Sequence, residues 1–289
     1  MHHSFDLVLT DNEMREFAQT VRAPGPDGTE ARIGHTLRKK TARVGLKDFV
    51  MATGAHDATA MARSWLPSGG RFDVFISHSH ADEDTAIGLA LWLKKTFGLE
   101  VFVDSCVWGN TDDLLREIDD EHCLRNDGRY DYAARNRTTS HVHMLLSVAL
   151  TEMIDASEVV FFLRTPSSSV TIDKVMDTSD TATLSPWIYH ELMMTRMLGW
   201  RPRADHRLVP LAKGRPDLTE KRADFRARFT VPTDHLTRLD WDGLWTWSRR
   251  WPLFRAAQME ALDVLYLVKG IKDEPPGPRG HSAGALLRK

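Results

Sequence analysis

The chain has 289 residues, of which 42% are hydrophobic and 27% are charged, a composition typical of globular rather than disordered proteins. Its 38 Lys and Arg residues nearly balance 40 Asp and Glu residues, so a net charge of −2 gives none of the basic character that nucleic-acid-binding proteins carry, and we expect no nucleic-acid partner. No apolar run reaches the roughly 20 residues that span a bilayer, so we expect no membrane association either.

The amino-terminal residues 1–17 lack a basic region followed by a long apolar stretch, so we expect no signal peptide. The 2 cysteines, Cys106 and Cys123, are too few for a disulfide framework and fit a reducing compartment. These features predict a cytoplasmic protein. The chain also carries 9 Trp and 13 His, more of both than is usual at this length.

Residues 1–70 are predicted to form an amino-terminal extension of unknown role. Asp11 is placed to cap a short helix through residues 16–21, and a turn cluster at residues 23–28 follows it. Residues 67–70 (Pro-Ser-Gly-Gly) have the composition of a linker.

After this linker the pattern predicts a strand, a helix and a second strand. Residues 72–77 (Phe-Asp-Val-Phe-Ile-Ser) form an apolar run typical of a buried strand. Residues 84–97 have an apolar helical face, and Gly98 is placed to end that helix. Residues 99–103 predict the second strand, closed by Asp104. The arrangement predicts a right-handed unit with parallel strands.

Beyond Asp104 the pattern predicts a turn at residues 108–110, a helix from Thr111 and a polar surface insertion near residues 125–140. Further elements alternate along the chain: a helix at 144–156, a strand at 158–163, a helix capped by Ser185 and ending near 198, short strands at 207–211 and 237–241, and a long amphipathic segment at 244–268. Pro252 predicts a kink or a break in that last segment, whose tryptophans we assign to packing or an interface. Residues 271–289 are expected to be a disordered tail.

Alternating strands and helices of this kind predict an α/β fold, a doubly wound parallel sheet spanning residues 71–270. Ligands of such sheets bind outside the carboxyl ends of the strands. We therefore expect the functional residues directly after Ile76, Val103 and Leu163.

A first interpretation of the residues after Ile76 is a metal site. His78, His80 and Asp82 have the H-x-H-x-D spacing of the metallo-β-lactamase fold, in which alternate residues of a loop bind zinc. Glu83, however, stands where that family has a further histidine, and a helix and a parallel strand follow. A zinc hydrolase is therefore the least favoured alternative, and we expect no metal.

A second interpretation rests on three segments in a fixed order: residues 73–78 (Asp-Val-Phe-Ile-Ser-His), residues 99–104 (Leu-Glu-Val-Phe-Val-Asp) and residues 185–192 (Ser-Pro-Trp-Ile-Tyr-His-Glu-Leu). Together they resemble the Toll/interleukin-1 receptor (TIR) domain, although Ile188 stands where that family most often has cysteine. The resemblance covers residues 72–211 and extends to the long terminal helix. It implies a flavodoxin-like doubly wound parallel sheet.

In the TIR proteins that are enzymes the substrate is NAD+, and the glutamate at the position of Glu191 is catalytic. Cleavage of the nicotinamide–ribose bond passes through an oxocarbenium-like state that a carboxylate stabilises. The resemblance implies that Ser77, His78 and Asp104 contribute to substrate binding, with NAD+ as substrate and no separate cofactor. Asp104 is equally compatible with a turn cap.

Trp187 lies four residues before Glu191, so both side chains project from one helix face. The resemblance implies that Trp187 stacks on nicotinamide, although a core position is equally compatible with the sequence. It also places Trp108 and Gly109 on the loop after the second strand, the BB loop, which gates the site and mediates self-assembly.

The resemblance leaves two functions open. One is an NAD+ glycohydrolase or cyclase that releases nicotinamide, as in prokaryotic anti-phage proteins that deplete NAD+ or signal to a partner effector. The other is a non-enzymatic TIR module that assembles with itself or with a sensor protein and keeps Glu191 as a relic. The sequence does not separate hydrolysis from cyclisation, because both start from the same intermediate.

Overall fold

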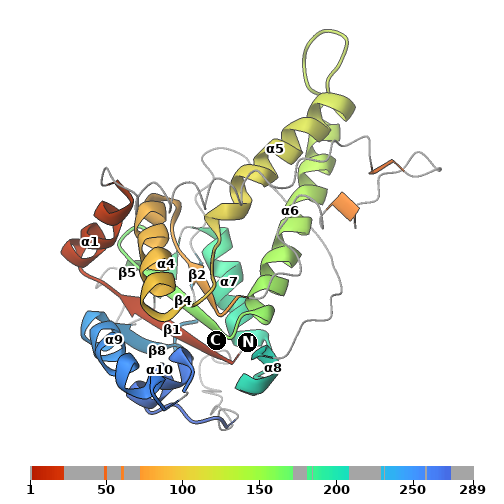
Figure 1. The fold of residues 1–289 in the computed structure, drawn as a ribbon. Helices are drawn as coiled ribbons and strands as arrows, with labels where there is room; N and C mark the ends of the chain where they lie inside the picture. Colours follow the sequence, from red (N-terminus) through yellow and green to blue (C-terminus); the bar gives the residue numbers. More distant parts are fainter. Residues whose placement is uncertain are drawn as a thin grey trace, which may run out of the picture.

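A computed structural model of the chain gives its fold (Figure 1). It describes residues 2–22, 49–50, 60–61, 72–171, 181–183, 185–207, 229–230, 232–257 and 259–274. The predicted turn cluster at 23–28, the predicted linker at 67–70, residues 208–211 of the predicted fourth strand and residues 275–289 of the predicted tail lie outside these residues.

Helices and strands alternate along the described residues. In chain order they are β1 (His3–Val8), α1 (Asp11–Arg22), β2 (Val74–Ser77), the short 3-10 helix η2 (His80–Asp82), α4 (Glu83–Phe97), β3 (Val101–Val103), α5 (Ser105–His122), α6 (Tyr132–Ala156), β4 (Val159–Arg164), β5 (Val170–Thr171), β6 (Thr181–Thr183), α7 (Pro186–Met197), α8 (Arg203–Arg207), β7 (Phe229–Thr230), β8 (Thr237–Asp240), α9 (Trp241–Arg255) and α10 (Ala261–Lys269).

The main sheet of the described residues has five parallel strands in the order β3-β2-β4-β1-β8. The predicted α/β class is therefore confirmed, as are the predicted strands that correspond to β2, β3, β4 and β8. A separate antiparallel sheet is formed by β5, β6 and β7. None of the described helices is both long and apolar enough to cross a membrane.

The amino-terminal residues 2–22 are part of this fold, so their assignment to a separate extension is wrong. β1 lies between β4 and β8, with Phe5 opposite Phe161 and Leu7 opposite Leu163. Phe5 and Leu7 are fully buried. Arg164 of β4 donates two hydrogen bonds to the Asp6 carboxylate, at 2.8 and 3.0 Å. A strand that pairs on both sides belongs to the core of the sheet, so β1 is part of the same domain as β2–β8.

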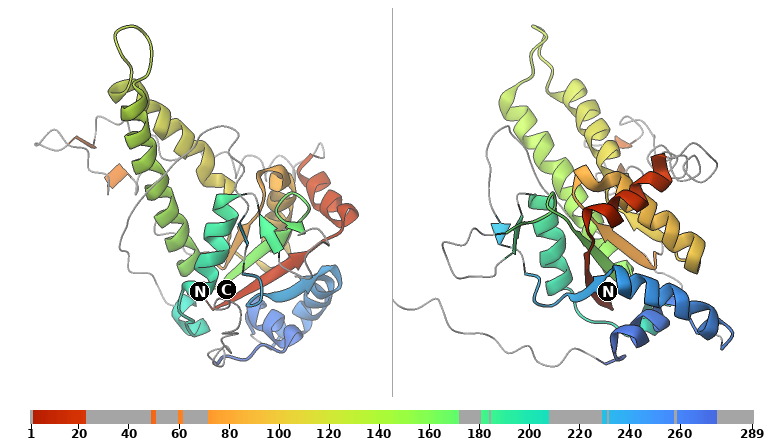
Figure 2. Two further views of the ribbon diagram at one scale, coloured as in Figure 1. Left: turned by 180° about the vertical axis from the view of Figure 1, so that it is seen from behind. Right: turned by 90° about the vertical axis from the view of Figure 1, so that its left-hand side faces the viewer.

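The two faces of the sheet are covered by different helices (Figure 2). Side chains of a strand alternate between its faces, so Val74 and Ile76 enter one core and Phe75 enters the other. The first core is closed by α1, α4, α9 and α10, and the second by α6 and α7. Ser77, two residues after Phe75, lies on the face covered by α7.

The segment between β3 and β4 is more helical than expected. α5 begins at Ser105, so Trp108 and Gly109 lie within a helix, and the prediction of a turn there is wrong. α6 begins at Tyr132, so most of the predicted surface insertion is helical as well. The actual connection is a short hairpin closed by a bridge between Leu124 and Tyr130.

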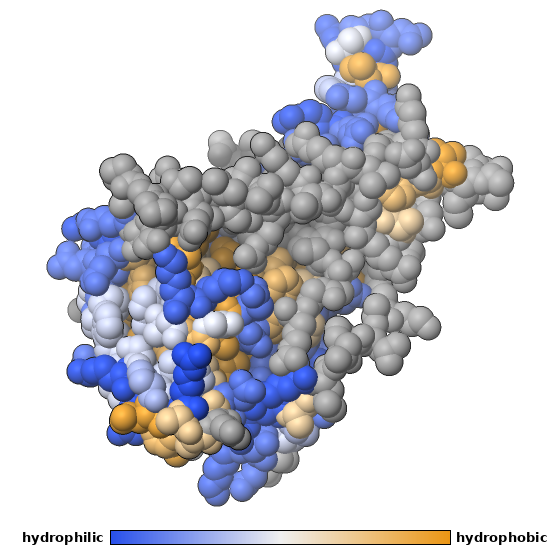
Figure 3. Space-filling view, viewed as in Figure 1, coloured by the Kyte–Doolittle hydropathy of each residue, from blue (hydrophilic) through white to orange (hydrophobic). Residues whose placement is uncertain are grey.

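Polar contacts explain why this segment is helical. Arg135 donates to the buried Asp119 at 2.6 Å across the two helices, and the Asp131 side chain caps the start of α6. The two helices project from the body of the molecule, and hydrophilic residues predominate at their tip (Figures 1 and 3). A solvated helix pair has the polar composition of a loop, so the sequence pattern predicted a surface insertion where the structure has helices.

The carboxy-terminal segment is divided between two helices, α9 and α10, as one of the predicted alternatives has it, but the break lies between Arg255 and Ala261 rather than at Pro252. Pro252 lies inside α9. Trp247 is fully buried and stacks on Phe97 with ring centroids 3.8 Å apart, which confirms its packing role.

Two further predictions are wrong in part. A strand is predicted at residues 207–211, but Arg207 is the last residue of the helix α8. Residues 271–274 are also ordered onto the fold, because Ile271 donates to the Tyr266 carbonyl at 2.8 Å.

The contact between α1 and α4 gives a first prediction. A Cβ atom at Gly88 of α4 would lie only 2.1 Å from the Phe17 carbonyl oxygen of α1. We expect Gly88→Ala to lower the free energy of unfolding by about 1–3 kcal/mol, because the two backbones must separate. Urea denaturation measures this loss. Gly199→Ala is the matched control, because a Cβ there meets nothing within 4 Å. Equal stability of the two variants would contradict the docking of α1.

Candidate functional site

The carboxyl ends of neighbouring strands bring three of the predicted site residues together. Ser77 is the last residue of β2, His78 follows it, and Asp104 directly follows β3. Glu191 comes from α7, which begins as predicted: the Ser185 side chain accepts from the Ile188 amide at 3.3 Å, and Pro186 occupies the first turn.

Glu191 is completely buried. The Ser77 hydroxyl donates to Glu191 Oε2 at 2.6 Å, whereas Glu191 Oε1 has no hydrogen-bond partner among the described residues. Burial raises the pKa of Glu191 well above its ordinary value of 4.5, the charge of Asp104 raises this pKa further, and the Ser77 hydrogen bond opposes both. The environment therefore favours the neutral carboxylic acid.

His78 and Asp104 form an ion pair between Nδ1 and Oδ1, and both side chains are buried. Burial by itself lowers the pKa of His78. The charge and hydrogen bond of Asp104, assisted by Glu83, outweigh it and leave the pKa raised above 6.5. Asp104 precedes α5 but makes no capping hydrogen bond, so the pairing with His78 replaces the turn-cap interpretation.

Ser105 is a site residue that the sequence analysis missed. Its side chain is 2% exposed, and its Oγ has no hydrogen-bond partner among the described residues. The available signal was its position directly after Asp104, at the end of a strand. A buried hydroxyl without a partner is unusual in a native structure and marks a position where a ligand group can bond.

The strand end after Leu163 is held by a separate hydroxyl cluster. The Thr165 hydroxyl donates to Asp82 Oδ2 at 2.6 Å, and the Thr165 amide donates to the Ser168 hydroxyl at 2.9 Å. Both residues are buried. These bonds fix the loop after β4 beside the start of α4.

The same contacts separate the residues of the H-x-H-x-D pattern. His78 bonds to Asp104, Asp82 accepts from Thr165, and His80 is exposed. Throughout the described ranges, no group of three His, Cys, Asp or Glu side chains lies close enough to hold a metal. The structure therefore overturns the arrangement on which the zinc-hydrolase alternative depended.

Two predicted site features lie elsewhere. Trp187 packs against the second core, which includes Phe75 and Phe102, and its ring lies edge-on to His143 with centroids 5.6 Å apart. This favours the core alternative over stacking on a substrate. Trp108 and Gly109 lie in α5 rather than on a loop, and their side chains are outside what the structure describes.

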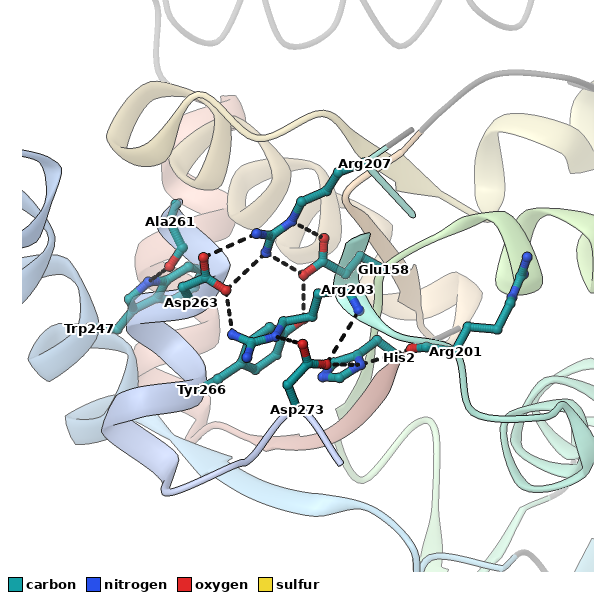
Figure 4. A network of polar contacts seen from close by, with 10 residues as sticks. All are labelled: His2, Glu158, Arg201, Arg203, Arg207, Trp247, Ala261, Asp263, Tyr266 and Asp273. Atoms are coloured by element: carbon teal, nitrogen blue, oxygen red, sulfur yellow. Dashed lines mark hydrogen bonds and ion pairs between the residues drawn. The ribbon is translucent and has the colours of Figure 1, made fainter. Parts of the chain in front are cut away.

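A second polar cluster, partly buried, lies at the opposite end of the strands (Figure 4). Glu158, directly before β4, accepts two hydrogen bonds from Arg207 and one from Tyr266. Arg207 and Arg203 also bond to Asp263 of α10. These groups form their hydrogen bonds and ion pairs with one another, and they lie at the amino ends of the strands. Both features indicate a structural role rather than a ligand site.

Comparisons of the chain with protein-family models, with curated proteins and with solved structures gave no match. The residues gathered at the carboxyl ends of the strands therefore carry the functional proposal through their chemistry.

Proposed function

We propose that the protein is a TIR-type, flavodoxin-like enzyme that cleaves the nicotinamide–ribose bond of NAD+, releasing nicotinamide and leaving ADP-ribose or its cyclised form. The observation that carries this proposal is Glu191, a buried carboxyl group at the carboxyl ends of the parallel strands, one oxygen of which has no hydrogen-bond partner in the part of the chain that the structure describes. Perturbed buried carboxyl groups at such strand ends are typical of catalytic sites.

The strand order supports the position of the site. From β2 the chain moves outward to β3 and then returns past β2 to β4, so the direction of winding reverses between β2 and β4. Doubly wound sheets bind ligands at this reversal point. Ser77 ends β2 there and holds Glu191 in place.

The chemistry needs little more than a carboxylate. Departure of nicotinamide leaves positive charge on the ribose, which an ionised Glu191 would stabilise while it accepts from a ribose hydroxyl. Nicotinamide leaves as a neutral base, so the step requires no strong general acid. In this proposal His78, Asp104 and Ser105 line the site, and Ser77 orients Glu191.

The test is nicotinamide release from NAD+, followed by chromatography. We expect Glu191→Gln to reduce the rate at least about 100-fold, because it removes the stabilising charge. Glu121→Gln is the matched control, since Glu121 is exposed on α5. Because Glu191 is fully buried, the site has to open for substrate, and the assay should include concentrated and crowded protein. Equal inactivity of wild type and Glu191→Gln under all these conditions would reject the proposal.

The same burial favours a second candidate, a non-enzymatic TIR assembly module. The projecting α5–α6 pair presents exposed Leu124, Tyr130 and Tyr132 at its tip. Light scattering distinguishes the two functions: assembly that Leu124→Ser abolishes, without nicotinamide release by the wild type, supports the module. By analogy with prokaryotic TIR proteins, either function would serve anti-phage defence, through NAD+ depletion or a partner effector.

A further inference from the structure

The titratable groups near Glu191 and its helix come from several elements. His78 follows β2 and Asp104 follows β3, and these two form an ion pair. α6 contributes His143 beside Trp187, and His190 on α7 itself bonds to Thr151 and the Ser147 carbonyl of α6. Within the described part of the chain no cation pairs with Glu191. The side-chain group that bonds to its carboxyl group is the neutral Ser77 hydroxyl.

An ionised Glu191 would therefore be a buried charge without a counter-charge. Such a state is unfavourable, because the charge loses its hydration and gains no partner, so the carboxyl group retains its proton when the site is empty. Burial and the charge of Asp104, which raise the pKa of Glu191, agree with this conclusion. Two buried oxygens in the site, Glu191 Oε1 and Ser105 Oγ, have no partner among the described residues and are available to a ligand.

We propose that this site exchanges a proton for a cationic ring: an N-substituted pyridinium binds beside Glu191, and the carboxyl proton passes to solvent. One positive charge enters and one leaves, so the net charge of the buried site is unchanged. The inference rests on the proposed function and identifies the feature of the substrate that is recognised, the permanent charge of the oxidised nicotinamide ring. The reduced, neutral ring supplies no such charge and is rejected.

In this scheme Asp104 is a positioning residue. Its negative charge retains the proton on Glu191 before binding and attracts the cation afterwards. The ion pair with His78 weakens the effect of this charge on Glu191 and on the ligand. Asp104→Asn should therefore reduce the number of protons released on binding, because part of the Glu191 population is then already ionised. A purely structural role would leave that number unchanged.

The test uses 1-methylnicotinamide, a pyridinium cation without a glycosidic bond, so that cleavage does not contribute protons. Calorimetry at pH 7 in two buffers of different ionisation enthalpy counts the protons released. We expect the wild type and the Glu121→Gln control to release a proton from each site in which Glu191 is protonated before binding, and Glu191→Gln to release none. Neutral nicotinamide should bind at least about tenfold more weakly to the wild type. The apparent affinity for the cation should fall about tenfold per unit decrease in pH below the pKa of Glu191.

Infrared spectroscopy supplies a readout that does not depend on a variant: the carboxylic-acid band of the wild type should disappear when the cation binds. Binding without proton release, equal affinity for the neutral ring, or no binding at millimolar cation would each overturn the inference. Nicotinamide release is measured separately. Proton release on binding of 1-methylnicotinamide without cleavage of NAD+ would reject the proposed catalysis alone. Cleavage of NAD+ with no proton release on binding of 1-methylnicotinamide would reject this inference alone.

Discussion

Arg207→Met is expected to lower the free energy of unfolding by about 3–5 kcal/mol, the loss typical when a buried ion pair is left with one partner. Glu158 is 2% exposed and accepts from Arg207 Nε and Nη2 at 3.0 and 2.9 Å. Without the guanidinium, its charge would remain buried, and among the described residues the Tyr266 hydroxyl, at 2.8 Å, would be its remaining side-chain donor. The pairs with Glu158 and Asp263 outweigh burial and raise the pKa of Arg207, in agreement with strong stabilisation of its charge.

Urea denaturation of the whole chain at pH 7 measures this effect. Arg116→Met is the matched control, because Arg116 is 73% exposed and lies 3.9 Å from Asp113, a pair expected to contribute less than about 1 kcal/mol. The double variant Arg207→Met/Glu158→Gln should recover part of the lost stability, since it no longer buries an unpaired charge. Equal stability of Arg207→Met and Arg116→Met would show that the cluster does not hold α8 and α10 to the sheet.

Local pattern was sufficient to predict the unit from β2 to β3. Its strands and helix lie within about thirty consecutive residues, and the apolar periodicity of each is undisturbed. The parallel arrangement then implied that Ser77, His78 and Asp104 share one edge of the sheet. The ion pair of His78 with Asp104 and the hydrogen bond from Ser77 to Glu191 could not be predicted, because they depend on side-chain orientation.

Contacts between distant parts of the chain explain the larger errors. β1 has only six residues, and buried Phe5 and Leu7 alternate with polar Ser4 and Asp6. Its recognition as a strand depends on β4, and the Asp6–Arg164 pair spans 158 positions. The Glu158 cluster similarly joins residues 49 and 108 positions away, at Arg207 and Tyr266. A short window of sequence does not contain all the residues of such a cluster, so local pattern cannot predict it.

The second large effect is a loss of stability in acid, caused by buried histidines. Burial lowers the pKa of His3 and of His206 to about 4 from the ordinary value of 6.5. His3 Nε2 lies 2.7 Å from the Thr237 hydroxyl across β1 and β8. Both rings are therefore neutral in the folded protein at pH 5, whereas the same histidines are protonated in the unfolded chain.

The sign follows from proton binding. Above pH 6.5 neither state binds these protons, so both histidines leave stability unaffected there. Between pH 6.5 and 4 the unfolded state binds more protons, so stability falls as the pH is lowered, by on the order of 2–3 kcal/mol per histidine. Denaturation from pH 7.5 to 4.5 should show a shallower decline for His3→Gln than for the wild type. His80→Gln, at an exposed position, should retain the full decline. Parallel curves for all three proteins would mean that His3 is protonated in the folded state, beside the Thr237 hydroxyl.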